Sequence, residues 1–96
     1  MDTLKEVLAE EGYSSEQTLI KDVTLLFALS KIEQYQSECD YYQRKYKMSI
    51  KEFDSKIHKS KGKENFENEE DFEDWEFSSH ALDWWKKRVS ALRKHA

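Results

Sequence analysis

The sequence contains no proline, only two glycines and a single cysteine in 96 residues. Hairpin turns and strand edges depend on glycine and proline, so this scarcity, together with the few β-branched runs, argues against an all-β fold. A single cysteine excludes an internal disulfide, and a lone thiol favours a reducing compartment. The composition therefore predicts an all-α protein located in the cytoplasm.

Long hydrophobic runs are also missing. The most apolar stretch, residues 23–29, is far shorter than the roughly 20 residues that a membrane-spanning helix needs. The N-terminus has no basic region followed by an apolar region, which is the pattern of a secretory signal. We therefore expect neither a signal peptide nor contact with a membrane.

The proportions of hydrophobic and charged residues limit the size of the core. Hydrophobic and charged residues each make up 38% of the chain, which predicts one domain, residues 1–96, with a thin core under a charged surface. A net charge of -4 argues against a general nucleic-acid-binding protein but leaves local basic patches open. An enzyme with a deep pocket does not fit these limits.

Four helical segments are predicted from hydrophobic spacing and from capping residues. They are a short N-terminal arm over residues 1–13, a long helix over 15–47, a short helix over 49–60 and a second long helix over 68–94. Gly12 is expected to end the arm in the left-handed conformation. Ser14 and Ser15 offer N-caps for the long helix, and Gln17 stands in the capping-box position relative to Ser14.

The short helix has a capping box of its own, since Ser49 is followed three residues later by Glu52. A polar, glycine-containing loop over residues 60–63 is expected to reverse the chain after it. The two long helices would then lie antiparallel.

Each long helix carries apolar residues that repeat every three and four positions, as in a pair of packed helices. These core rows are Leu25, Ala28, Ile32, Tyr35, Cys39, Tyr42 and Tyr46 in the first helix, and Trp75, Ser78, Leu82, Trp85, Val89 and Leu92 in the second. They predict an antiparallel helical hairpin. Residues 19–29 are apolar almost all round, so this segment should be covered on more than one side. Dimerisation into a four-helix bundle would provide such cover.

Charge is arranged in two blocks that meet at the predicted turn. Residues 44–63 contain eight bases and two acids, and residues 64–76 contain eight acids and no base. In a hairpin these blocks should face or flank each other. The acids lack the glycine-pivoted spacing of a cation loop, so we expect a solvated helix start or a protein-binding surface, with no metal site and no cofactor.

Catalytic residues are not indicated. The three histidines are far apart, without helical i,i+4 pairing and without a neighbouring cysteine, so neither a zinc site nor a cysteine nucleophile is suggested. Cys39 lies in the core row of the first helix and is expected to be a small buried apolar residue. The sequence predicts a protein that is not an enzyme.

A second apolar face lies outside the core row of the last helix. Phe77, Ala81 and Trp84 are on this face beside Arg88, and aromatic residues and arginine dominate interface hot spots. Either this face binds a protein, or the short helix or the arm covers it. The predicted partner-binding residues are Glu69, Glu70, Asp74, Phe77, Trp84 and Arg88.

Two segments resemble a group of small helical prokaryotic proteins. Residues 45–53 read KYKMSIKEF and residues 64–77 read ENFENEEDFEDWEF, which is similar to a KYxMSxxEF … ENFExExDxxDWEF pattern of antitoxin-like members of two-gene toxin-antitoxin modules. The resemblance covers residues 35–85. It implies a small acidic protein that binds and silences a toxin encoded beside it.

Two other functions remain open. A nucleic-acid-binding regulator would use the basic segment 44–63, with Tyr41, Tyr42 and Tyr46 stacking on bases. It predicts binding that falls steeply with salt and that charge reversal at Lys56, Lys59 and Lys61 weakens. A purely structural coiled-coil homodimer predicts that no second protein co-purifies.

Overall fold

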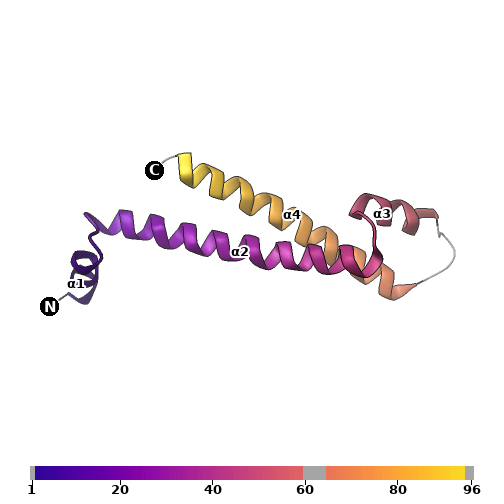
Figure 1. Cartoon of the computed structure of the whole chain (residues 1–96), viewed down its shortest axis with the longest axis horizontal. Coiled ribbons are helices and arrows are strands. Elements are labelled where there is room, and N and C mark those ends of the chain that lie inside the picture. The colour runs from indigo at the N-terminus through magenta and orange to yellow at the C-terminus, as the bar shows by residue number, and fades with distance from the viewer. Residues whose placement is uncertain (1, 60–64, 95–96) are drawn as a thin grey trace.

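The computed structural model describes residues 2–59 and 65–94, and every regular element in them is a helix. The elements are α1 (Thr3–Glu10), α2 (Glu16–Tyr46), α3 (Ile50–Lys59) and α4 (Phe66–Lys94). The long helices α2 and α4 pack against each other in opposite directions, with α3 beside α4 where the chain reverses (Figure 1). The predicted all-α helical hairpin is therefore confirmed. It measures 66 × 26 × 18 Å.

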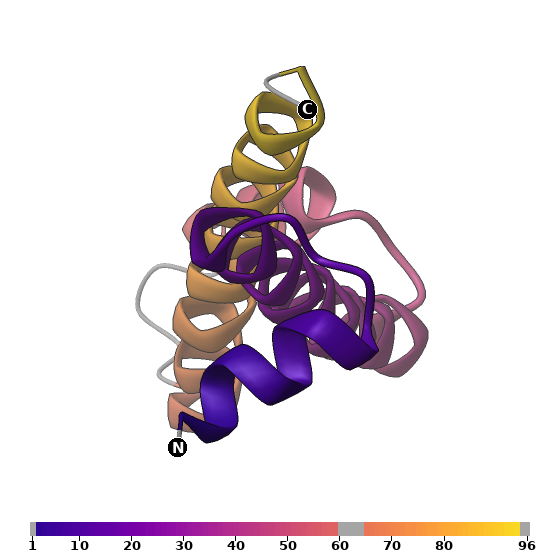
Figure 2. The ribbon, with the colours of Figure 1, turned by 90° about the vertical axis from the view of Figure 1, so that its left-hand side faces the viewer.

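The arm is a true helix that lies across the end of the hairpin where the N-terminus is (Figure 2). The Asp2 side chain accepts a hydrogen bond from the Leu4 amide, 3.1 Å away, and so caps α1. Gly12 has a φ of 76°, which confirms its expected left-handed conformation. Leu8 is buried, and the Tyr13 hydroxyl donates to Asp22 of α2 at 2.8 Å. These two residues attach α1 to the long helix.

The cap of α2 differs from the expected capping box. The Ser15 hydroxyl accepts from the Thr18 amide at 3.2 Å, and Ser15 itself is extended. Pairing of Ser14 with Gln17 was therefore the wrong register, because the serine next to the first helical residue is the one whose hydroxyl reaches the free amides. At its other end α2 stops at Tyr46, and Lys47 caps it with a left-handed φ of 55°.

The other two helix starts also follow from local side-chain chemistry. The predicted capping box of α3 is confirmed, since the Ser49 hydroxyl accepts from the Glu52 amide at 3.2 Å and the Glu52 carboxylate accepts in return at 3.4 Å. Helix α4 begins at Phe66, two residues before the predicted start at 68, because the Asn65 side chain accepts from the Asn68 amide. The predicted loop over 60–63 lies outside the described residues.

An aromatic cluster forms the core at the closed end of the hairpin, where α2, α3 and α4 meet. Phe53 of α3 is fully buried, and its ring centroid lies 4.0 Å from that of Tyr46 and 5.7 Å from that of Trp75. Tyr42 stacks on the other part of Trp75 at 5.9 Å, and Phe72 lies 6.3 Å from Phe53. Burial of Phe53 and Trp75 in this cluster contributes apolar stabilisation to the fold.

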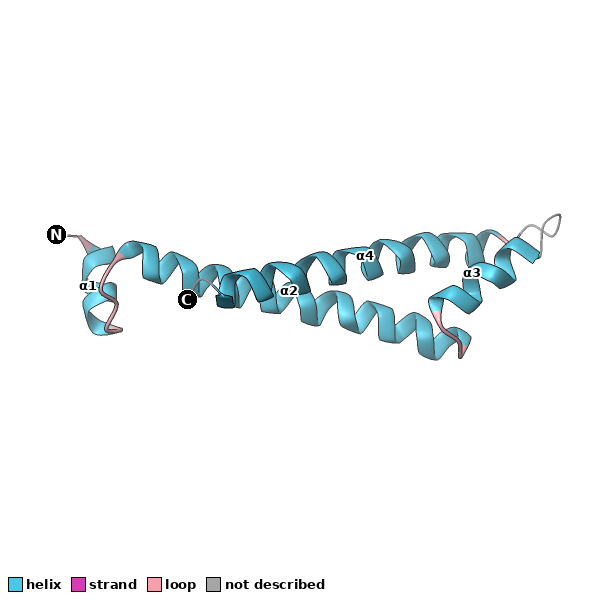
Figure 3. Cartoon of the chain, turned by 90° about the horizontal axis from the view of Figure 1, so that it is seen from above, coloured by secondary structure: helices cyan, strands magenta, loops and turns pink. Residues whose placement is uncertain are grey.

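Toward the open end the core narrows to one row of contacts between α2 and α4. Ala28, Leu82 and Val89 are buried there, and the buried Ser78 hydroxyl donates to Glu38 at 2.7 Å. Ala28 is 1% exposed, and its small side chain allows α4 to approach α2 closely. The remaining core-row residues are half-buried, namely Leu25, Ile32, Tyr35, Cys39, Tyr42, Tyr46, Trp85 and Leu92. The hairpin as a monomer therefore has a thin core between its two long helices, whose course Figure 3 shows from above.

We predict that Phe53→Ala lowers the free energy of unfolding by about 3–5 kcal/mol, the usual cost of emptying a fully buried phenylalanine site. Urea denaturation followed by circular dichroism measures it. Phe66→Ala is the matched control, because Phe66 is 69% exposed, and we expect it to change the value by about 0.5 kcal/mol or less. Equal effects of the two substitutions would contradict the proposed core.

We also predict that Lys47→Gly stabilises the protein by about 0.5–1 kcal/mol, because glycine adopts a left-handed φ without the strain of a Cβ. Gln34→Gly, on the exposed surface in the middle of α2, should instead destabilise it by about 1 kcal/mol. Thermal denaturation of the two variants should show shifts of opposite sign. A loss of stability in Lys47→Gly would show that this terminus is not strained.

Candidate functional site

Phe77 and Trp84 project from one side of α4. They are seven residues apart, which is about 20° short of two helical turns, so their side chains leave the helix in nearly the same direction. Phe77 is 64% exposed and Trp84 is 47% exposed. Of the two alternatives that the sequence left open for this face, cover by α3 or α1 does not occur, because both rings remain exposed.

A shallow hollow of about 450 Å³ lies next to Phe77, between α2 and α4. The Phe77 ring packs edge-on against Tyr35 of α2, with 6.0 Å between the ring centroids. Asp74 and Tyr41 also line the hollow, as does Glu38, which accepts from Ser78 at its base. The hollow combines aromatic walls with carboxylates.

A second hollow of about 300 Å³ lies farther along the same side, next to Trp84. The Arg88 guanidinium lies over the Trp84 ring at 4.2 Å from its centroid, in a cation–π contact. Trp85 also lines this hollow and packs edge-on against Phe27, with 5.8 Å between the ring centroids. This hollow is apolar with one cation at its margin.

The two hollows and the exposed rings form what we call the aromatic face: Tyr35, Asp74, Phe77, Trp84, Trp85 and Arg88. Glu70 belongs to the same side, because it precedes Phe77 by seven residues. Glu69 does not, since eight residues place it about 80° away round the helix. The structure therefore brings together five of the six predicted partner-binding residues and separates Glu69 from them.

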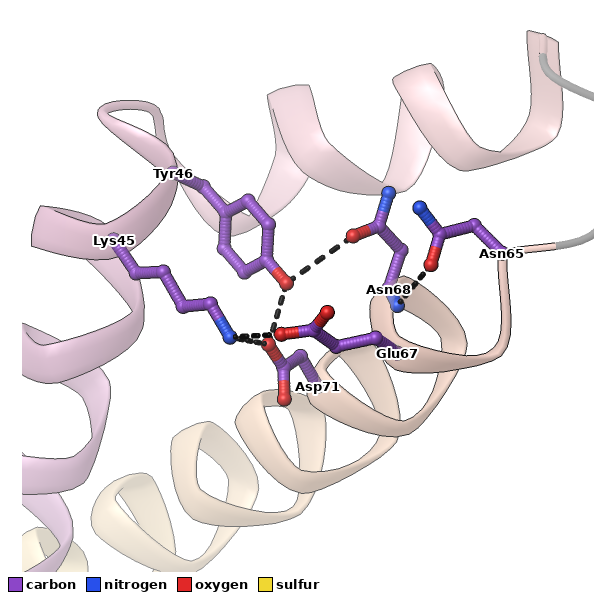
Figure 4. A network of polar contacts seen from close by, with 6 residues as sticks. All are labelled: Lys45, Tyr46, Asn65, Glu67, Asn68 and Asp71. Carbon is purple, nitrogen blue, oxygen red and sulfur yellow. Dashed lines mark hydrogen bonds and ion pairs between the residues drawn. The ribbon is translucent and has the colours of Figure 1, made fainter.

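A polar network closes the hairpin on the aromatic cluster (Figure 4). Lys45 of α2 donates to Glu67 at 2.9 Å and to Asp71 at 2.6 Å, both on α4. The Tyr46 hydroxyl donates to Asp71 and, at 3.3 Å, to Asn68. The predicted pairing of basic and acidic blocks is confirmed at this point.

This network changes the ionisation of its members. Burial and the hydrogen bond to Asp71 raise the pKa of the Tyr46 hydroxyl to about 12. Burial alone would raise the pKa of Asp71, but the hydrogen bonds from Lys45 and Tyr46 outweigh it and lower the pKa. Hydrogen bonds to Asp71 and Glu67 raise the pKa of Lys45. All three groups are held in the forms that bind one another at neutral pH.

Part of the basic segment, residues 44–63, takes part in this network or packs in the core. Tyr42 and Tyr46 both stack on Trp75, so their rings pack within the hairpin. Arg44, Lys47 and Lys51 are exposed, and Lys61 and Lys63 lie outside the described residues. The predicted stacking of Tyr42 and Tyr46 on bases would need the closed end to open.

The surroundings of Cys39 and of the possible metal-ligating side chains bear on the chemistry that the chain could perform. Cys39 is half-buried, and burial, followed by the charges of Asp40 and Glu38, raises the pKa of its thiol, which disfavours the nucleophilic thiolate. Within residues 2–59 and 65–94, no three His, Cys, Asp or Glu side chains are placed to hold a metal ion. No helix in that part of the chain combines the length and apolarity needed to cross a membrane.

Some members of the site could not be assigned from the sequence. Glu38 and Tyr41 line the hollow beside Phe77, although neither belongs to the core row of α2. Phe72 belongs to the core cluster, and its place three residues before Trp75 is the helical spacing that indicates it.

Comparisons with family models, with curated proteins and with solved structures find no match to this chain.

We predict that Asp71→Asn lowers the free energy of unfolding by about 1–2 kcal/mol near neutral pH, because it removes the charge from two hydrogen bonds. The pKa of Asp71 is lowered on folding, so its contribution is present above the ordinary value of 3.8 and is lost as the pH falls through the lowered pKa. The difference between wild type and variant should therefore vanish in strong acid. Urea denaturation between pH 2 and pH 8 measures this.

Asp83→Asn is the matched control for this prediction. Asp83 pairs with Lys87 one turn along α4 at 2.9 Å, and both side chains are well exposed. Such pairs contribute about 0.5 kcal/mol or less. A pH-independent effect of Asp71→Asn, or an equal effect of Asp83→Asn, would contradict the role given to the network.

Proposed function

We propose that this chain is a non-catalytic protein-binding module, an antitoxin-like inhibitor that neutralises a partner toxin by direct binding. The observation that carries the proposal is the aromatic face, on which Phe77 and Trp84 stay exposed on one side of α4 beside two hollows. Exposed aromatics grouped with an arginine are typical of protein interfaces. The KYKMSIKEF and ENFENEEDFEDWEF segments support the antitoxin class.

The shape and charge of the face favour an amphipathic helix as the bound element. The two hollows follow the groove between α2 and α4, and a helix binds such a groove through apolar residues on successive turns. Asp74 and Glu70 give the groove negative charge toward the closed end, and Arg88 gives it positive charge toward the open end. A partner helix with basic residues at one end and acidic residues at the other would complement both.

The reinforced closed end supports binding through a preformed groove. The network of Lys45 and Asp71 and the aromatic cluster fix the register of α4 on α2, and this register sets the spacing of the two hollows. A preformed groove loses little conformational entropy on binding. The single cysteine agrees with action in the cytoplasm.

A nucleic-acid-binding regulator is the alternative. This alternative is weakened because the rings of Tyr42 and Tyr46 pack on Trp75 and are not free to stack on bases. What remains is an electrostatic surface made by the exposed bases of residues 44–59. Such binding would depend steeply on salt and little on Phe77 or Trp84.

The proposal is tested by co-expressing the chain with the product of the neighbouring gene, followed by affinity purification and a growth assay. We expect the two proteins to co-purify and the chain to restore growth. Phe77→Ala and Trp84→Ala should each weaken binding about 30-fold or more, because truncation of an aromatic hot spot costs about 2 kcal/mol. Titration calorimetry measures the affinities.

Phe66→Ala is the control, since it removes an equally exposed phenylalanine from the same helix and should leave binding unchanged. Circular dichroism should show that all three variants remain folded, because exposed side chains contribute little to stability. Co-purification that survives loss of both Phe77 and Trp84 would refute the aromatic face as the binding site. Salt-dependent retention on RNA or DNA, with no protein partner, would favour the alternative.

A further inference from the structure

The aromatic face continues from α4 onto the first half of α2. Phe27 is 54% exposed and packs edge-on against Trp85, which in turn contacts Trp84 with 4.9 Å between the ring centroids. The sequence predicts cover on more than one side of residues 19–29, but α4 covers only the side of α2 that carries Ala28. The exposed rings of both long helices therefore form one apolar surface, which stays open in the described part of the chain.

The charges on this surface are divided between its two ends. Toward the open end of the hairpin, Lys31 and Arg88 each lie over an exposed aromatic ring. Toward the closed end, Glu38 and Asp74 line the hollow beside Phe77. Among the residues that the structure describes, no ion pair involves any of these four charged side chains. The surface is thus cationic at one end and anionic at the other.

The residues that α4 contributes are arranged symmetrically about Ala81. The midpoint between Phe77 and Trp84 falls between residues 80 and 81, and the midpoint between Asp74 and Arg88 falls at Ala81. Turning α4 end for end about Ala81 exchanges the members of each pair. A second copy of α4 lying antiparallel on the first would therefore place ring against ring and cation against carboxylate.

Helix α2 has the same symmetry at the same level. The midpoint between Lys31 and Glu38 falls between residues 34 and 35. Ser78 donates to Glu38 across the hairpin. Because α2 and α4 are antiparallel, the residue three positions after Ser78, which is Ala81, lies level with the residue three positions before Glu38, which is Tyr35. One twofold axis therefore serves both helices.

The charges determine which way round two copies meet. A twofold axis across the hairpin places α2 on α2 and α4 on α4, both antiparallel, so the cationic end of each copy lies on the anionic end of the other. A twofold axis along the hairpin would place α2 of one copy on α4 of the other and would bring the two cationic ends together. Only the first arrangement is electrostatically complementary.

We propose that two copies of the chain pack through the aromatic face about a twofold axis at Ala81 and form a homodimer with a four-helix core. Each Trp84 packs against Phe77 of the other copy, and each Arg88 pairs with the other copy's Asp74. The dimer covers the face that the proposed function gives to a toxin, so the two associations compete. Only this competition rests on the proposed function.

Charge reversal at Arg88 and Asp74 tests the arrangement, with the dimer of the chain alone measured by sedimentation equilibrium. Arg88→Glu and Asp74→Arg should each dimerise about tenfold more weakly than wild type or worse, because each variant meets like charge at both contacts. An equimolar mixture of the two should recover the wild-type affinity as a heterodimer, since both contacts then join opposite charges. Lys86→Glu makes the same change in net charge as Arg88→Glu, but beside Leu29 on the other side of the hairpin, and should leave the dimer intact.

A disulfide at the axis tests the contact directly. Gln34 is exposed and lines the hollow beside Phe77, so Gln34→Cys in a Cys39→Ala background places the new thiols of two copies opposite each other. We expect a cross-linked dimer on oxidation, because such a contact brings the Cα atoms within disulfide range. Glu33→Cys in the same background is the control, since Glu33 points about 100° away round α2, and should not cross-link.

The outcomes separate the dimer from the proposed function. A wild type that stays monomeric, a charge-reversed mixture that fails to recover, or equal cross-linking at residues 33 and 34 would each overturn the dimer. These measurements contain no toxin, so the absence of a toxin partner would refute the proposed function and leave the dimer standing. A toxin that binds the cross-linked Gln34→Cys dimer as tightly as the reduced chain would overturn the competition.

Discussion

The packing of Phe53 between Tyr46 and Trp75 is the interaction on which the rest of the structure depends. It joins the short helix to both long helices at one point, where the ring of Phe53 is completely removed from solvent. Lys45 and Tyr46 then bind Asp71 at the rim of the same cluster. Because these contacts lie next to the chain reversal, they set the register of α4 along its whole length, and the alignment of Ala28 with the second half of α4 follows from it.

The same register determines which side chains are left over. Once Trp75, Leu82 and Val89 are committed to the core, the residues two positions after Trp75 and Leu82, namely Phe77 and Trp84, must point elsewhere. No other helix of the described chain lies over them. The aromatic face is thus a geometric consequence of the core row, and its spacing is as fixed as the core itself. This is why a protein with little buried apolar surface can still hold exposed aromatic side chains in a defined arrangement.

Sequence reasoning predicted the helices well because their spacing, caps and charges are local properties. The capping box of Ser49 and Glu52 and the conformation of Gly12 follow from neighbours within a few residues, and the hairpin follows from two apolar rows of similar length. It failed where two local solutions compete, as with Ser14 and Ser15, or where a cap lies outside the apolar pattern, as with Asn65. It also grouped Glu69 with Glu70 and Phe77, although Glu69 lies about 80° away from Phe77 round α4, because a cluster of acids in sequence does not reveal which of them share a side of the helix. The place of Glu38 and Tyr41 beside Phe77 depends on the pairing of two helices, which no single segment encodes.

The uneven distribution of the core along the hairpin gives its local unfolding a direction. Core contacts are dense near Phe53 and sparse beyond Val89. Local unfolding should therefore begin at the C-terminal end of α4 and proceed toward the closed end of the hairpin. Amide hydrogens in the last turns of α4 and the first turns of α2 would then exchange through small openings, while those around Trp75 would exchange only through complete unfolding. A ligand that contacts both α2 and α4 near the open end would then oppose this local unfolding, because it adds contacts where the core has few.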